Sequence, residues 1–196
     1  MSEAGLVFVI TGPSGVGKGT LIRGLMERMP EIQLSVSAPT RSPRAGERDG
    51  VDYHFLTPEE FAARRAAGDF VEDVDYAGSS YGTLRSELEG KTAAGAPVVL
   101  EIEVQGARQV RRALPGATQI FIAPPTLEEL RKRLNARGTD DPEKVERRLR
   151  VAEEELDARA EFAYVVVNDE LARALEELEE VVRNELADTA AAEPGG

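Results

Sequence analysis

Residues 12–20 read Gly12-Pro-Ser-Gly-Val-Gly-Lys-Gly-Thr20 and match the pattern GxxxxGK. The apolar run Leu6–Ile10 precedes them, and apolar residues at helical spacing follow from Leu21 to Met29. A strand, a glycine-rich loop and a helix in this order are the setting in which backbone N–H groups wrap phosphate groups. The helix N-terminus and a lysine add positive charge. The stretch therefore predicts a nucleoside triphosphate site, with Lys18 at the β- and γ-phosphates.

Apolar runs and amphipathic segments alternate along the rest of the chain. This alternation indicates an α/β fold: a parallel sheet flanked by helices, of the type built around a phosphate-binding loop. The later strands are expected at 97–103, 119–123 and 164–168, and the later helices at 126–138, 141–159 and 171–186.

The segment 37–84 has a different character and is expected to form a small mixed α/β subdomain. Residues 51–56 and 70–76 have strand-like patterns. Thr57-Pro-Glu-Glu60 has the capping-box pattern with proline at the first helical position. Thr83 is expected to cap the helix that follows.

Charge and composition exclude several functions. The 24 basic and 36 acidic side chains give a net charge of -12, which argues against a nucleic-acid partner. The chain has no cysteine and a single histidine, His54, which excludes disulfides, thiolate metal sites and a histidine-based metal site. No segment has the length of a transmembrane helix or the pattern of a signal peptide. We therefore expect a cytoplasmic protein with no membrane partner and no obligate protein partner.

A second stretch resembles a known family. Ser35-Val-Ser-Ala-Pro-Thr-Arg-Ser-Pro-Arg-Ala-Gly-Glu47, with Gly50-Val-Asp-Tyr53, is similar to the GMP-binding segment of guanylate kinases. The resemblance covers nearly the whole chain up to its tail. It implies transfer of the γ-phosphoryl group of ATP to GMP, with Mg²⁺, in purine nucleotide metabolism, and dGMP as a further acceptor. The other matching motifs are Phe70-Val-Glu72, Tyr81-Gly-Thr83, 100–106, 121–125, 133–138 and 167–169.

The resemblance also divides the chain into parts. We expect a single guanylate-kinase-like domain over 1–186, because no stretch is long enough to link two domains. Its expected parts are a core (5–36, 95–125 and 160–186), a GMP-binding subdomain (37–84) and a helical lid (126–159), followed by a flexible tail (187–196).

The GMP phosphate is expected to lie among two arginines and two tyrosines. Arg41 and Arg44 carry planar forks suited to a phosphate dianion, and Tyr53 and Tyr81 can each donate a hydrogen bond. The resemblance implies this role and adds Glu47 to the GMP site. The alternative is a solvated basic loop with both tyrosines in the core.

Guanine recognition needs acceptors for N1–H and the 2-amino group and a donor for O6. The resemblance assigns Glu72 to the first task and Ser37 and Thr83 to the second, with Glu103 also holding GMP. AMP would leave the Glu72 carboxylate without a donor and should be rejected. Without the resemblance, Glu72 would be interpreted as an exposed acid within a strand.

The metal ligands depart from the usual pattern. Gly19 follows the lysine where a magnesium-binding Ser or Thr is common, so either Thr20 substitutes for it indirectly or Mg²⁺ is held mainly by the nucleotide and water. The first of two acids at the end of a strand, Glu101, would organise Mg²⁺ through water. The family usually has Asp at 101 and 103, and both are Glu here; alternatively, one of them is an edge charge.

Arginines of the lid are expected to stabilise the transferring phosphoryl group. By resemblance these are Arg133, Arg137 and Arg148, with Arg41 bridging the two phosphates; a surface helix with salt bridges is the alternative. Residues 138–142 are expected to be the hinge of the lid. No strong general base is needed, because the attacking group is a phosphate oxygen. The residues expected to bind ATP are Gly12, Pro13, Ser14, Gly15, Val16, Gly17, Lys18, Gly19, Thr20 and, on the adenine side, Asn168.

Two other kinds of protein remain as alternatives. A P-loop kinase for another small molecule would have a poor guanine site, against which Ser37, Glu72 and Thr83 argue. An interaction module that binds phosphorylated peptides would typically have a degraded phosphate loop, whereas this loop is intact. A P-loop GTPase is excluded at 168–171, where Asn-Asp-Glu-Leu lacks the lysine of NKxD.

Overall fold

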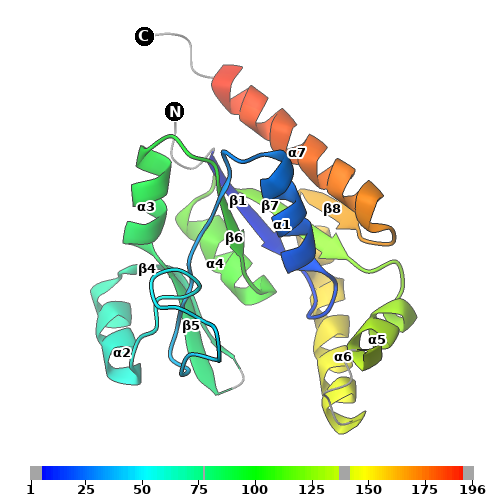
Figure 1. Cartoon of the computed structure of the whole chain (residues 1–196), viewed down its shortest axis with the longest axis horizontal. Helices are drawn as coiled ribbons and strands as arrows, with labels where there is room; N and C mark the ends of the chain where they lie inside the picture. The colour runs from blue at the N-terminus through cyan, green and yellow to red at the C-terminus, as the bar shows by residue number, and fades with distance from the viewer. Residues whose placement is uncertain (1–5, 77, 137–141, 192–196) are drawn as a thin grey trace.

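The structure is a computed structural model that describes residues 6–76, 78–136 and 142–191. A central sheet lies between helices, and two smaller units extend from one end of it (Figure 1). One unit holds α2, β4 and β5, and the other holds α5 and α6. The first unit lies within the expected GMP-binding subdomain and the second within the expected lid, and the functional roles of both stay predictions.

The central sheet is parallel throughout, as the sequence predicts. Its strand order is β2-β6-β1-β7-β8, so the strand that leads into the phosphate loop is central. In such a sheet ligands bind beyond the carboxyl ends of the strands. The five strands are β1 (Val7–Thr11), β2 (Gln33–Leu34), β6 (Val98–Glu101), β7 (Thr118–Ala123) and β8 (Tyr164–Val167).

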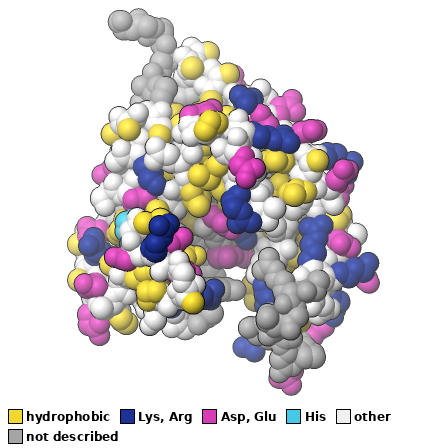
Figure 2. All heavy atoms as spheres, viewed as in Figure 1, with side chains coloured by type: hydrophobic (Ala, Val, Ile, Leu, Met, Phe, Trp, Pro, Cys, Tyr) yellow, Lys and Arg dark blue, Asp and Glu magenta, His cyan; other side chains and the backbone are white. Residues whose placement is uncertain are grey.

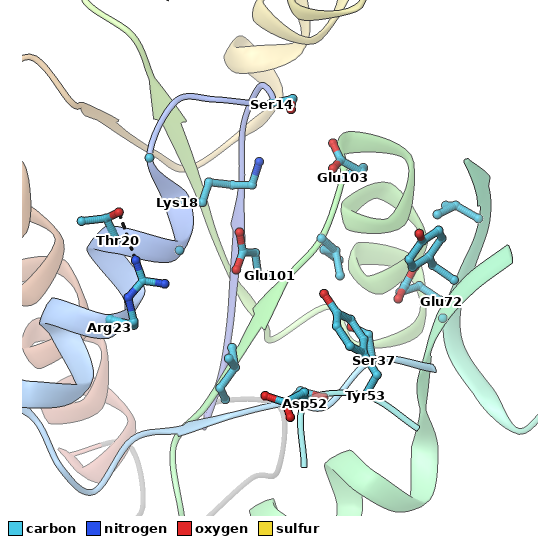
Figure 3. Close-up of a pocket in the computed structure, with 18 of the residues that line it drawn as sticks. Ser14, Lys18, Thr20, Arg23, Ser37, Asp52, Tyr53, Glu72, Glu101 and Glu103 are labelled. Carbon is cyan, nitrogen blue, oxygen red and sulfur yellow. Dashed lines mark hydrogen bonds between the residues drawn. The ribbon is translucent and has the colours of Figure 1, made fainter. Parts of the chain in front are cut away.

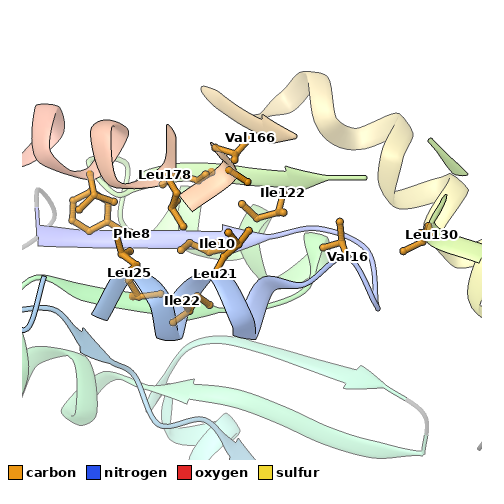
Figure 4. Close-up of a cluster of buried hydrophobic side chains, with 14 of the residues drawn as sticks. Phe8, Ile10, Val16, Leu21, Ile22, Leu25, Ile122, Leu130, Val166 and Leu178 are labelled. Carbon is orange, nitrogen blue, oxygen red and sulfur yellow. The ribbon is translucent and has the colours of Figure 1, made fainter. Parts of the chain in front are cut away.

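Alternating side chains of β1 build two separate cores. Phe8 and Ile10 pack against α1 (Lys18–Arg28) and α7 (Leu171–Ala191), as Figure 4 shows. Val7 and Val9 belong to the cluster on the opposite face. The helices that contribute to that second cluster are α3 (Arg85–Ala93) and α4 (Val104–Ala113). A strand buried on both faces explains the continuous apolar run in the sequence.

The subdomain is a three-stranded antiparallel sheet of order β3-β5-β4 covered by α2 (Pro58–Ala67). The capping box is confirmed: Thr57 Oγ1 accepts from Glu60 N at 3.1 Å, and Glu60 Oε2 accepts from Thr57 N at 2.8 Å. The strands are β3 (Ala38–Pro39), β4 (Phe70–Tyr76) and β5 (Ser79–Leu84).

The expected lid corresponds to α5 (Leu127–Ala136) and α6 (Pro142–Asp157), which a 3₁₀ turn, Ala158–Glu161, follows. Both helices join the first core, through Leu130 of α5 and Leu149 of α6. Arg137 and most of the expected hinge fall in 137–141, outside the described residues.

The structure corrects three expectations and adds one helix that the sequence patterns do not predict. Residues 51–56 form no strand: Val51 and Asp52 lie in a turn, Tyr53 forms a single bridge with Asp49, and the backbone pairs toward β3 through two N–H groups, those of His54 and Leu56, which donate to the carbonyl oxygens of Ser37 and Pro39. Thr83 lies within β5 and α3 starts after Leu84 with no side-chain cap. Helix α7 extends to Ala191 instead of ending at 186. Helix α4 was not anticipated. Among the described helices, none is long and apolar enough to cross a membrane.

Candidate active site

The carboxyl ends of β1 and β6 open into a cavity of about 500 Å³ between the phosphate loop and the subdomain. Figure 2 shows the molecule hollowed at this place, with acidic side chains inside the hollow. Figure 3 shows Lys18 on one wall and Glu72 on the opposite wall. Predicted residues that line the cavity are Ser14, Gly15, Gly17, Lys18, Gly19, Thr20, Ser37, Tyr53, Glu72, Tyr81, Glu101 and Glu103.

The phosphate loop has the backbone that its glycines permit. Three glycines of the loop have positive backbone φ angles: 142° at Gly12, 88° at Gly15 and 103° at Gly17. Residues that carry a side chain rarely adopt such angles. A Cβ atom on Gly12 would lie 2.2 Å from the carbonyl oxygen of Ile122, so no other residue fits there. Lys18 Nζ donates to the carbonyl oxygen of Gly12 at 2.5 Å, which keeps the ammonium group inside the loop.

The side chain of Asn168 supports the phosphate loop through a hydrogen bond. This side chain is 6% exposed, and Nδ2 donates to the carbonyl oxygen of Val16 at 2.8 Å. From the lid, Arg133 Nη2 donates to the carbonyl oxygen of Asn168 at 3.0 Å and Nη1 to that of Val16 at 3.4 Å. The Asn168 amide therefore supports the loop, and its expected contact with adenine stays a prediction.

A second lid arginine reaches the tip of the loop. Arg148 Nη2 donates to Ser14 Oγ at 2.7 Å. Arg133 and Arg148 thus both contact the phosphate loop, and their contact with ATP phosphates stays a prediction. Arg133 Nε also lies 3.8 Å from Glu129 Oε1, so one ion pair of the alternative, a surface helix with salt bridges, is present.

The expected guanine site contains a buried acid. The side chain of Glu72 is 3% exposed, and burial raises its pKa to about 7. The Thr83 hydroxyl donates a hydrogen bond to Glu72 Oε1 at 2.8 Å, and this bond lowers the pKa of Glu72. A hydroxyl has one proton, so Thr83 cannot donate to Glu72 and to a purine O6 simultaneously. Ser37 is left as the expected donor to O6.

The expected phosphate site is organised around one arginine. Arg41 forms a two-pronged pair with Glu47, at 2.6 and 2.8 Å, and its guanidinium carbon lies 4.8 Å from the ring centre of Tyr53. The Arg41 hydrogen bond and the backbone N–H of Arg44 lower the Glu47 pKa to about 2. Tyr81 also interacts with Arg41. Arg44 itself is exposed, so its phosphate contact stays a prediction.

The carboxylate of Glu101 lies near Lys18 and could offer oxygen ligands. Glu101 lies directly below the lysine in Figure 3, and a Cβ atom on Gly19 would be 3.6 Å from its Oε2. Thr20 Oγ1 instead accepts from Arg23 Nη2 at 3.3 Å. Among the described residues no group of three or more His, Cys, Asp or Glu side chains could hold a metal ion, so the magnesium role of Glu101 and of Thr20 stays a prediction.

Three residues near the cavity were not anticipated. Arg23 and Asp52 line it, and Arg23 follows Gly19 by one helical turn, a spacing that could have identified it. Burial and the neighbouring Glu103 raise the pKa of Glu155, on α6, to about 9. No local pattern marks Asp52 or Glu155.

A phosphate loop at the end of a central parallel strand, facing a second polar pocket in one cavity, is the arrangement of a P-loop kinase that acts on a small acceptor. A family model described as "Guanylate kinase" matches residues 5–185. The chain belongs to the guanylate kinase family.

Named relatives support the same family. A guanylate kinase of Synechococcus sp. (strain CC9311) is 56% identical over 171 residues, covering 87% of this chain and 90% of the relative. One of Frankia casuarinae is 54% identical over 166 residues, with 85% and 90% covered. The crystal structure of guanylate kinase from Anaplasma phagocytophilum has a TM-score of 0.73 at 30% identity, covering 91% of this chain and 85% of that one.

Proposed function

We propose that this chain transfers the γ-phosphoryl group of ATP to GMP, giving ADP and GDP, and accepts dGMP as well. One observation carries the choice of acceptor. Glu72 is a buried acid held by Thr83, and it lines the same cavity as Lys18. A buried carboxylate is costly without donors, and guanine supplies two, N1–H and the 2-amino group. Production and recycling of guanine nucleotides would follow from this reaction.

The proposed chemistry depends mainly on position and charge. Lys18 and the N–H groups of the loop would hold the β- and γ-phosphates of ATP. Arg41, fixed by Glu47, and the hydroxyls of Tyr53 and Tyr81 would hold the acceptor phosphate. Its oxygen is already a nucleophile, so no side chain need remove a proton.

Arg133 and Arg148 would stabilise charge on the transferring group from the lid. In the structure both side chains donate to the phosphate loop itself, so ATP phosphates would take over these donors. Mg²⁺ bound with ATP would neutralise phosphate charge, and Glu101 is the residue proposed to hold its water ligands.

A coupled assay that follows ADP tests the proposal. ATP and Mg²⁺ would be combined in turn with GMP, dGMP, AMP, CMP and UMP. We expect turnover with GMP and dGMP and little with the other three. Turnover of AMP without turnover of GMP would refute the base assignment. Robust binding of GMP with no transfer to any acceptor would favour an interaction module.

A further inference from the structure

Helix α4 lies against β4, the strand that carries Glu72. Gly106 on this helix faces the Glu72 carboxylate, and a Cβ atom there would lie 2.7 Å from Oε2 and 3.3 Å from Cδ. Gly106 lies within a helix and is not among the glycines with positive φ, so its backbone does not require glycine. What requires glycine is the space that the carboxylate occupies.

A second residue of α4 fixes the backbone next to Glu72. Gln109 Nε2 donates to the carbonyl oxygen of Asp73 at 2.7 Å, and Gln109 Oε1 accepts from Asp73 N at 3.1 Å. β4 is an edge strand, and its register with β5 shifts between Phe70 and Glu72. The Gln109 amide therefore satisfies the open edge of β4 one residue after the shift, as a neighbouring strand would.

The same helix is joined to the catalytic end of the central sheet. It follows β6 directly, and its N-cap is Glu103, which lines the cavity together with Glu101. Through α4, the position of the Glu72 carboxylate is set relative to the strand that lies beside β1. A purine held by Glu72 is thereby placed at a fixed distance from the phosphate loop.

We propose that Gly106 and Gln109 are positioning residues that fix where the Glu72 carboxylate meets the purine base, an inference that rests on the proposed function. Gly106 leaves the space in which the carboxylate lies flat against the helix. Gln109 holds the strand from which the carboxylate projects. Neither residue needs to touch GMP.

The first test is Gly106→Ala, with Gly90→Ala as the matched control. Gly90 lies in α3, and nothing is within 4 Å of its added Cβ. The Gly106 variant should fold, because the atom in the way is the end of a flexible side chain. We expect KM for GMP to rise about tenfold to a hundredfold, with KM for ATP changed by less than about twofold. Gly90→Ala should match wild type in both.

A double-mutant cycle shows whether the effect passes through Glu72. In the Glu72→Ala background, Gly106→Ala should cause no further loss of kcat/KM for GMP. An equal loss in both backgrounds would overturn the proposal. Gln109→Met, which keeps the size but loses both hydrogen bonds, should also raise KM for GMP selectively and reduce the preference for GMP over IMP.

The proposed function and the positioning role of Gly106 and Gln109 can fail separately. If wild type does not phosphorylate GMP, the proposed function fails. If wild type does so and both Gly106→Ala and Gln109→Met keep the wild-type KM for GMP, only the positioning role is overturned. Should Gly106→Ala not fold, the Gln109 variant decides.

Discussion

The side-chain amide of Asn168 donates a hydrogen bond of 2.8 Å to the carbonyl oxygen of Val16, 152 positions earlier in the chain. This bond joins the loop after β8 to the phosphate loop after β1. A Cβ atom on Gly17 would lie 2.6 Å from Asn168 Nδ2, so the two loops are in close contact. The shape of the phosphate loop therefore depends on a residue far from it in sequence.

Asn168→Ala should weaken the binding of ATP more than that of GMP. The loop would lose one of its supports, and we expect KM for ATP to rise about tenfold and the free energy of unfolding to fall by about 1–2 kcal/mol. KM for GMP should stay near wild type. Initial-rate kinetics and denaturant unfolding measure both effects. An equal rise of the two KM values would mean that Asn168 supports the whole cavity.

The pKa of Glu72, raised to about 7 by burial, predicts how GMP use depends on pH. Only the ionised carboxylate accepts from both N1–H and the 2-amino group. Below the pKa the acid is protonated, so kcat/KM for GMP should fall about tenfold per pH unit below about 7 and level off above it. Glu72→Gln has no proton to lose here and should remove this step. A profile unchanged by Glu72→Gln would assign the step to another group.

Thr83→Val should move that midpoint upward. The hydrogen bond from Thr83 stabilises the ionised form of Glu72 and lowers its pKa, so its loss raises the pKa further. At neutral pH the variant should use GMP less efficiently and recover at higher pH. Thr83→Ser, which keeps the hydroxyl, should retain the wild-type midpoint. If Thr83→Val loses activity equally at every pH, Thr83 acts on the base instead.

Arg41→Lys tests the phosphate site. Lysine keeps the charge but cannot form the two-pronged pair with Glu47 or stack on Tyr53 in the same way. We expect KM for GMP to rise about tenfold. The Kd for ATP, measured by titration in the absence of GMP, should stay unchanged. A variant with wild-type KM for GMP would place the phosphate elsewhere.

The sequence predicts those parts of the fold whose signals are local. Neighbouring residues alone produce the patterns that predict the phosphate loop, the capping box at Thr57 and the buried strands. Helix α4 is not predicted although Val104, Ala107 and Val110 recur at helical spacing and are buried; its start has no capping signal, because Glu103 makes no side-chain cap.

The features of the site that local sequence patterns do not predict depend on tertiary contacts. The register shift in β4 leaves Phe70, Val71 and Glu72 all buried, which strand alternation does not indicate. The support of the phosphate loop by Asn168 appears only when two distant strands lie in one sheet. The resemblance to a family identified these positions, but the contacts of the structure give them physical roles.

The most direct measurement is a comparison of Glu72→Gln with wild type for both substrates. The amide keeps the size of the side chain but replaces one acceptor with a donor that opposes guanine N1–H. We predict that kcat/KM for GMP falls at least about a hundredfold while the Kd for ATP is unchanged. Equal losses for GMP and ATP would contradict the account, because Glu72 would then be a structural residue.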